Sequence, residues 1–154
     1  MGSVSLEEIR RLRELTGAGI TDAKQALIDA GGDFDKALEA MRAKGLTKAE
    51  KRAEREARAG LVEAYSHDGR IGVVVEVNCE TDFVARTDEF KTLARDLCLH
   101  IAAMDPADEA ELAAQPFVKN PEQTIDQLVR EHIAKLGENI VVRRFARFEI
   151  GETA

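Results

Sequence analysis

The sequence contains few of the residues that build disulfide scaffolds and metal centres. Among 154 residues there are 2 cysteines, 3 histidines and no tryptophan. Two cysteines are too few for a disulfide framework, and neither they nor the scattered histidines have the spacing of a zinc site. No run of about 20 apolar residues is present, so no transmembrane helix is predicted. We therefore expect a soluble protein of the reducing cytoplasm that holds no metal and no cofactor.

Positive charge is also scarce. The chain has 22 lysine and arginine residues against 29 aspartate and glutamate residues, a formal net charge of −7 at pH 7. Nucleic acids and anionic membranes attract proteins that present clustered positive charge. We therefore predict no direct binding to nucleic acid or membrane. The N-terminal segment also lacks the positive-then-apolar order of a secretory signal.

What is present begins with three helical patterns in residues 1–45. Apolar residues recur there at the spacing of amphipathic helices. Residues suited to helix caps and glycine-containing turns separate the three segments. The predicted boundary residues are Ser5 and Glu8 (start of the first helix), Thr16–Gly19 (its end), Thr21 (start of the second), Gly31 and Gly32 (its end), Asp33 (start of the third) and Gly45 (its end).

A charged stretch follows over residues 46–59. It holds five basic residues and three glutamates and has almost no apolar face. Its alanine, glutamate, lysine and arginine residues are strong helix formers. We predict a solvated helical linker. A basic arm that contacts nucleic acid is the alternative, which the three glutamates disfavour because they dilute the positive field.

From residue 60 onward the pattern becomes mixed. Two β-rich runs, Leu61–Tyr65 and Ile71–Val77, flank an Asp68-Gly69 pair, which predicts a hairpin. An apolar stripe from Phe90 to Met104 predicts a helix. Further predictions are mostly loop over 105–126, a helix that starts at Asn120-Pro121 and ends at Gly137, and a strand over 140–150.

These patterns together predict an α+β fold. The expected organisation is an N-terminal three-helix domain over residues 1–45, the charged helical linker over 46–59, and a core over 60–154 in which an antiparallel sheet packs with helices.

No motif of covalent catalysis is present. There is no Ser/His/Asp or Cys/His constellation, no phosphate loop and no GxGxxG. The short pattern Gly17-Ala18-Gly19 follows a helix rather than a strand, which argues against a dinucleotide site. We therefore predict that the chain is not an enzyme.

The acidic cluster around residues 80–89 has two interpretations. Glu80, Asp82 and Asp88 supply oxygens of the kind that Mg²⁺ prefers. The alternative is helix capping, because residues of these types favour N-cap and first-turn positions: Thr81, Asp82, Thr87 and Asp88. Capping is the favoured interpretation. Phe83 stands seven residues before Phe90, in helical phase, so on the residues alone it is expected to be core.

Three stretches of the sequence resemble the bacterial elongation factor Ts family in its short form. They are Leu15–Gly19 with Asp22 and Lys24, then Asn78–Ala85, then Ile133–Phe145. They run in order from residue 15 to residue 145, so the resemblance covers nearly the whole chain. The family is the guanine nucleotide exchange factor for elongation factor Tu. The resemblance implies that this chain binds GDP-bound elongation factor Tu, promotes GDP release and allows GTP to load.

The resemblance also assigns roles to residues. The N-terminal domain would be a ubiquitin-associated (UBA-like) fold that docks on the G domain of the partner. In the core, a four-residue segment would intrude beside the Mg²⁺ and nucleotide of the partner and displace the ion, with the main contribution from Asp82 and Phe83. The residues implied in the two contacts are Gly17, Ala18, Gly19, Ile20, Asp22 and Lys24 in the N-terminal domain, and Thr81, Asp82, Phe83 and Val84 in the core.

The sequence departs from the family pattern in two places. Ile20 and Thr21 stand where the family commonly has two methionines, so the N-terminal contact is expected to differ in detail. Only residues 105–133 fill the place of a longer helical excursion in many members. Shorter members are expected to pair through their sheets, and the strand over 140–150 therefore suggests a homodimer.

Two other functions remain open at this point. The chain could be a UBA-like adaptor that binds a partner without exchange activity. It could also be a Mg²⁺-dependent enzyme built on Glu80, Asp82 and Asp88, in which case the isolated chain would bind Mg²⁺ directly.

Overall fold

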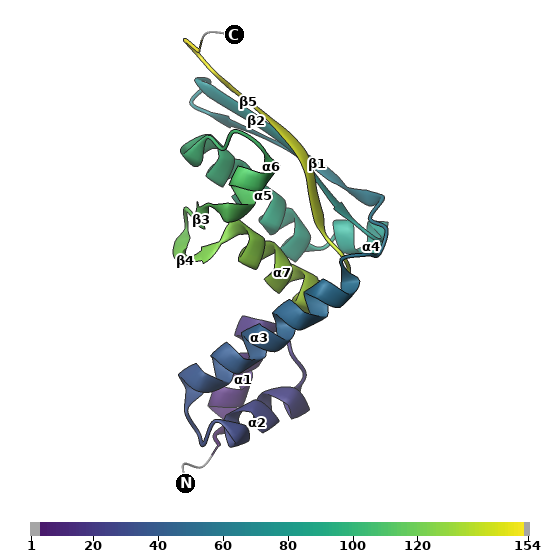
Figure 1. Cartoon of the computed structure of the whole chain (residues 1–154), viewed down its shortest axis with the longest axis vertical. Coiled ribbons are helices and arrows are strands. Elements are labelled where there is room, and N and C mark those ends of the chain that lie inside the picture. Colours follow the sequence, from purple (N-terminus) through teal and green to yellow (C-terminus); the bar gives the residue numbers. More distant parts are fainter. Residues whose placement is uncertain (1–3, 153–154) are drawn as a thin grey trace.

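The computed structural model describes residues 4–152, with the side chains of residues 46–51 excepted. It has the predicted α+β composition, with helices in the N-terminal part and a sheet packed with helices in the remainder (Figure 1). The elements in chain order are α1 (Leu6–Thr16), α2 (Ile20–Asp29), α3 (Phe34–Arg52), β1 (Ala59–His67), β2 (Ile71–Cys79), α4 (Asp82–Ala85), α5 (Asp88–Met104), α6 (Glu109–Ala114), β3 (Pro116–Phe117), β4 (Asn120–Thr124), α7 (Ile125–Leu136) and β5 (Val141–Glu149).

The three N-terminal helices enclose a small core of their own. Its buried residues are Ile9, Leu12, Ala23, Leu27 and Ala37. The predicted cap at Ser5 is confirmed, because its hydroxyl accepts a hydrogen bond from the Glu8 amide at 3.1 Å. The predicted cap at Thr21 is wrong. Gly19 takes the extended conformation at the N-cap position, and α2 therefore begins at Ile20.

The third helix does not end at Gly45, contrary to the sequence prediction. α3 continues to Arg52, and the Arg52 guanidinium donates a hydrogen bond to the Ile133 carbonyl of α7 at 3.1 Å. A Cβ atom placed on Gly45 would lie 3.2 Å from the Cβ of Ala134. The glycine therefore serves close packing of two helices rather than helix termination.

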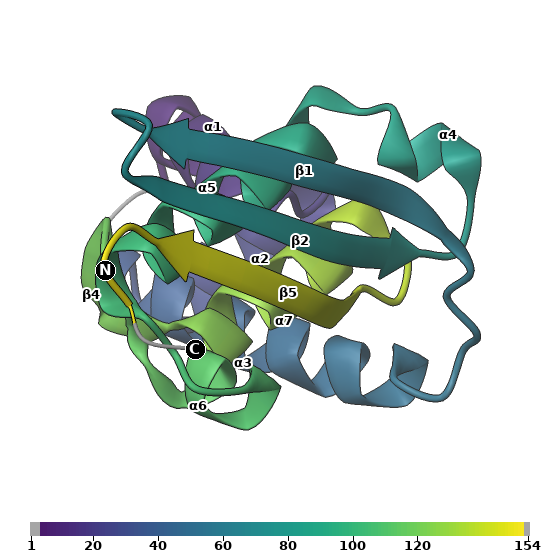
Figure 2. The same ribbon diagram turned by 90° about the horizontal axis from the view of Figure 1, so that it is seen from above.

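The sheet has the strand order β1-β2-β5, and both neighbouring pairs are antiparallel. The predicted hairpin between β1 and β2 is confirmed. Asp68 and Gly69 have φ values of 53° and 68°, the left-handed pair that a tight hairpin with right-handed strand twist requires. Figure 2 shows the helices behind one face of this sheet, while the other face is uncovered.

The main core lies between the covered face of the sheet and α5. Val73, Val75 and Val77 of β2 point into it, and Phe90 of α5 is fully buried there. The alternation of buried and exposed residues along β2 follows from the two-residue period of a strand. Both cysteines lie in this core as free thiols.

The segment 105–126 is more ordered than predicted. It contains the short helix α6 and the hairpin β3–β4, and Asn120–Thr124 forms a strand rather than a helix start. α7 begins later, at Ile125, because Thr124 and Gln127 form a reciprocal capping box. Its predicted end at Gly137 is confirmed, with φ of 79°. Among the residues that the structure describes, no helix is long and apolar enough to cross a membrane.

Candidate partner interface

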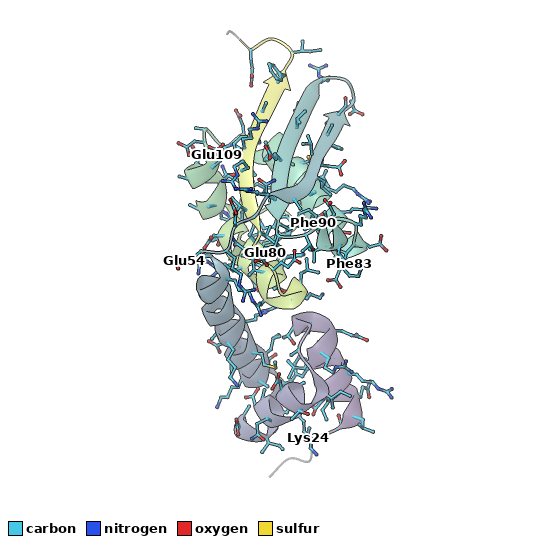
Figure 3. All side chains as sticks on the ribbon, turned by 90° about the vertical axis from the view of Figure 1, so that its right-hand side faces the viewer. Lys24, Glu54, Glu80, Phe83, Phe90 and Glu109 are labelled. Atoms are coloured by element: carbon cyan, nitrogen blue, oxygen red, sulfur yellow. The ribbon has the colours of Figure 1, made fainter. Side chains whose placement is uncertain are left out.

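The four-residue helix α4 presents an aromatic ring to solvent. Phe83 is 84% exposed, whereas Val84 and Ala85 on the same turn are each only 7% exposed. The side chains of Val84 and Ala85 thus anchor the turn in the core, while the larger Phe83 side chain points outward (Figure 3). The expectation that Phe83 is core is therefore wrong. Its helical phase with Phe90 is broken because α4 and α5 are separate helices.

Thr81 caps α4 and connects it to a distant loop. Its side-chain oxygen accepts a hydrogen bond from the Val84 amide at 3.3 Å, as predicted for a cap. Its hydroxyl donates to Oε2 of Glu138 at 2.7 Å. The backbone amides of Glu80 and Thr81 donate to Oε1 of the same carboxylate at 3.1 and 2.9 Å. Glu138 therefore receives three hydrogen bonds from the residues just before α4.

The loop that carries Glu138 also holds the end of the linker. The buried side chain of Asn139 donates hydrogen bonds to the carbonyls of Ala53 and Arg55, at 3.3 and 2.7 Å. The backbone amide of Asn139 donates to Oε2 of Glu80 at 3.2 Å. The two segments therefore bond in both directions, because Glu138 accepts the Glu80 backbone amide. The end of the linker is thus fixed to the core through its backbone. The charged side chains after the end of α3, which belong to Glu54, Arg55, Glu56 and Arg58, are exposed as predicted.

A second polar cluster joins the strands beside this loop. Asn78 donates to the Ala59 carbonyl at 3.2 Å and to the Glu76 carboxylate at 3.1 Å, and it accepts from Arg143 Nε at 3.1 Å. The hydrogen bond from Asn78, and then that from Arg144, lowers the pKa of the Glu76 carboxyl. Sequence reasoning did not assign these contacts. The sequence indicates a polar cluster only indirectly: polar residues end the second β-rich run at Asn78, and two more, Glu138 and Asn139, follow the helix-ending Gly137.

Cys79 lies beside α4 but is not poised for chemistry. Its side chain is fully buried, and desolvation raises the pKa of the thiol to about 11. Because the thiolate is the reactive form of cysteine, this thiol is inert at neutral pH. Cys79 therefore acts as a small buried hydrophobe of the core.

The structure does not assemble the acidic residues of this region into a metal site. Thr81 and Thr87 cap α4 and α5, while Asp82 and Asp88 lie in the first turns of those helices. Among the residues described, no group of three or more histidine, cysteine, aspartate or glutamate side chains is placed to hold a metal ion. The geometry therefore favours the capping interpretation.

The N-terminal candidate residues surround the turn between α1 and α2. Ile20 is 58% exposed, and the Asp22 and Lys24 side chains are also exposed. Ala18 is half-buried, and Gly19 has open space around it, because a Cβ there would meet no atom within 4 Å. This part of the turn is free to contact another molecule.

Gly17 differs from its neighbours in this turn. It ends α1 in the left-handed conformation with φ of 71°. A Cβ atom on it would lie 2.4 Å from Cγ of Lys135 in α7. Its conformation and its contact with α7 are sufficient to account for a glycine here, so its predicted partner contact has no separate support.

The two candidate surfaces are not one site. Lys24 lies at the far end of the helical part, whereas Phe83 projects from the core (Figure 3). A partner that touched both would have to extend along the molecule (Figure 3).

Comparison with known proteins connects these surfaces to a family. A family model described as "Elongation factor TS" matches residues 14–106 and 80–154. The chain is 43% identical over 195 residues to elongation factor Ts of Caldanaerobacter subterraneus subsp. tengcongensis, with 97% of this chain and 98% of that protein covered. The chain belongs to the elongation factor Ts family. The initial resemblance is therefore confirmed, and the family is one of translation elongation factors.

Other relatives show the same extent of similarity. Elongation factor Ts of Carboxydothermus hydrogenoformans is 44% identical over 195 residues, with 97% of this chain and 90% of that protein covered. That of Thermodesulfovibrio yellowstonii is 39% identical over 195 residues, with 98% of both covered. Because these alignments are longer than the 154 residues of this chain, the relatives carry segments that have no counterpart here.

Proposed function

We propose that this chain is a guanine nucleotide exchange factor that binds GDP-bound elongation factor Tu and accelerates GDP release. The observation that carries the proposal is Phe83, whose ring is 84% exposed on a turn that is otherwise anchored in the core. Solvent exposure of so large an apolar side chain has no benefit for the isolated fold, because burial of a phenylalanine stabilises by about 1.5–3 kcal/mol. Buried aromatic rings are common anchors of protein interfaces.

The chemistry of the partner explains how such a ring could release a nucleotide. Mg²⁺ requires nearly ideal octahedral geometry and links protein ligands to the phosphates of the nucleotide. A wedge formed by Asp82 and Phe83, flanked by Thr81 and Val84, would shift those ligands and displace the ion. GDP would then lose its bridge to the protein without any contact between the wedge and the base.

The proposal requires no covalent catalysis. If the chain lowers the affinity of its partner for GDP, then GDP lowers the affinity of the partner for the chain by the same factor. The excess of GTP over GDP sets the net direction of exchange. In this account the chain is not an enzyme and needs no cofactor of its own.

The N-terminal helices would provide the second contact with the partner. The exposed residues of the α1–α2 turn, Ile20, Asp22 and Lys24, are available for it together with Ala18 and Gly19. The function also implies a cytoplasmic location and no direct binding to nucleic acid or membrane. A homodimer through the uncovered face of the sheet belongs to the same proposal.

Release of fluorescent GDP from elongation factor Tu tests the proposal. The wild-type chain is expected to accelerate release catalytically, and Asp82→Ala and Phe83→Ala are expected to lose most of this effect while they remain folded. Val118→Ala is the control, because Val118 is 42% exposed in the β3–β4 hairpin, which lies on the opposite side of the core from α4 (Figure 1). If wild type forms a complex but leaves release unchanged, the chain is an adaptor without exchange activity.

A further inference from the structure

The helix that carries Phe83 is too short to be stable by itself. α4 has four residues, a single turn. A first helical turn is unfavourable in isolation, because it fixes many backbone dihedral angles for one hydrogen bond. Phe83 adds no packing energy, since its ring is exposed. The direction in which the ring points must therefore be determined by what holds the two ends of the turn.

The C-terminal end of the turn is held by packing, and the N-terminal end by Glu138. Val84 and Ala85 are buried against the core. At the other end, Glu138 accepts the backbone amides of Glu80 and Thr81 and the Thr81 hydroxyl, all at 2.7–3.1 Å. Because the Thr81 hydrogen is donated to Glu138, the Thr81 oxygen keeps its lone pairs free for the Val84 amide, which is the capping bond of the helix.

We propose that Glu138 is a positioning residue for nucleotide exchange: its carboxylate sets the orientation of α4 and hence of the Phe83 ring. Glu138 lies 57 positions from Thr81 in the chain, in the loop between α7 and β5. Hydrogen bonds to an ionised acceptor are shorter and stronger than those between neutral groups. The inference rests on the exchange function proposed above, and it assigns the orientation step to a residue outside the wedge.

Three substitutions separate this geometric role from a charge contact with the partner. Glu138→Ala removes the acceptor. Glu138→Gln loses the charge but keeps an oxygen for the two amides, and its NH₂ can donate to Thr81 instead. Glu138→Asp keeps the charge, but its shorter side chain cannot reach all three donors. Glu109→Ala is the matched control, because Glu109 is an exposed glutamate of α6 on the opposite side of the molecule from Phe83 in Figure 3.

The test measures GDP release from elongation factor Tu against the concentration of the full-length chain. We expect Glu138→Ala and Glu138→Asp to lower the maximal release rate about 10- to 100-fold, since a misplacement of about 1 Å costs that much in positioned reactions. The half-saturating concentration should change less than about 3-fold, because the N-terminal contact is intact. Glu138→Gln should retain most of the rate. The reverse order, with Asp active and Gln inactive, would show a charge contact and overturn the proposal.

Hydrogen exchange of the free chain provides an independent readout. Protection of the Glu80 and Thr81 amides should fall about 10-fold or more in Glu138→Ala, while amides of β2 keep theirs. If wild type accelerates release and Phe83→Ala does not, but Glu138→Ala matches wild type, the positioning role is refuted and the exchange function stands. If wild type itself does not accelerate release, the exchange function fails. Should Glu138→Ala not fold, the contrast between Gln and Asp decides the question.

Discussion

Gly45 of α3 packs against Ala134 of α7 so closely that a Cβ atom on the glycine would lie 3.2 Å from the alanine Cβ. A second glycine, Gly17, lies against Lys135 on the next position of α7. The N-terminal helices therefore rest on the core through two positions that have no side chain. Because the two candidate contact surfaces lie on these two parts, this packing sets their relative orientation.

Substitution of Gly45 by a large residue should disturb that packing. We expect Gly45→Leu to lower the free energy of unfolding by about 1–3 kcal/mol, the usual cost of an overfilled contact. Chemical denaturation measures this change, and small-angle scattering reports whether the N-terminal helices stay docked. Ala40→Leu, at an exposed position of the same helix, should leave both unchanged. Equal effects of the two substitutions would mean that the α3–α7 contact does not depend on the glycine.

Gly60 should be among the least replaceable residues of the sheet. Its φ is 144°, and an added Cβ would lie 2.1 Å from the Val77 carbonyl oxygen on the paired strand. We expect Gly60→Ala to destabilise by about 3 kcal/mol or more, because strain and a backbone clash add. Gly72→Ala is the control, since nothing lies within 4 Å of its added Cβ. It should change the free energy of unfolding by less than about 0.5 kcal/mol, as judged by urea titration.

Phe83 and Phe90 should respond in opposite ways to truncation. Phe90 is fully buried, so Phe90→Ala is expected to destabilise by about 3–5 kcal/mol. Phe83→Ala should cost less than about 0.5 kcal/mol, because the ring is in contact with water in both the folded and the unfolded chain. Thermal unfolding of both variants beside wild type checks this. A large loss in Phe83→Ala would mean that the ring packs on its own core after all.

Protonation of His100 should destabilise the fold at mildly acidic pH. Its Nδ1 accepts the Val118 amide at 3.1 Å and its Nε2 donates to Gln115 at 2.9 Å, so the buried ring is neutral. Desolvation lowers the pKa of His100 below its usual 6.5. The unfolded chain therefore binds the proton first, and the contribution of the neutral ring is complete above pH 6.5 and decreases as the pH falls toward the folded pKa.

Urea unfolding at several pH values between about 7.5 and 5 measures this effect. The free energy of unfolding of wild type should decrease more steeply over that interval than that of His100→Gln, which has no group to titrate at the site. Parallel curves for the two proteins would show that His100 does not account for the acid sensitivity.

The uncovered sheet face should mediate self-association. It carries Val62, Ala64, Val74, Ala146 and Phe148, all of them exposed. Val74 pairs with Ala64 and Ala146, so small side chains surround it and a second sheet could approach closely. We expect light scattering to give a dimer for wild type and a monomer for Val74→Glu. Val118 is exposed outside this face, between β3 and β4, so Val118→Glu should not alter the molecular mass that light scattering gives. A wild-type monomer at all concentrations would contradict the homodimer.

The helices, the β1–β2 hairpin and the α+β organisation could be predicted from local patterns. Apolar periodicity, the Ser5 cap, the Asp68-Gly69 turn and the Gly137 stop depend on residues that are close in the chain. The family could likewise be identified, because its motifs are contiguous stretches of sequence. The domain boundaries at residues 45 and 59, the UBA-like character of the N-terminal helices and the roles of the site residues stay predictions.

Only the tertiary structure decided which neighbours Gly45, Phe83 and Glu138 have. The local pattern predicts a helix end at Gly45, but the glycine packs against α7 within a longer helix. Helical phase alone predicts that Phe83 is core, but α4 and α5 are separate helices and its ring is exposed. The contacts of Glu138 could not be assigned from the sequence, because its partners are 57 and 58 positions away. Close packing and hydrogen bonding across such distances depend on how the elements are arranged in space, and no local pattern encodes that arrangement.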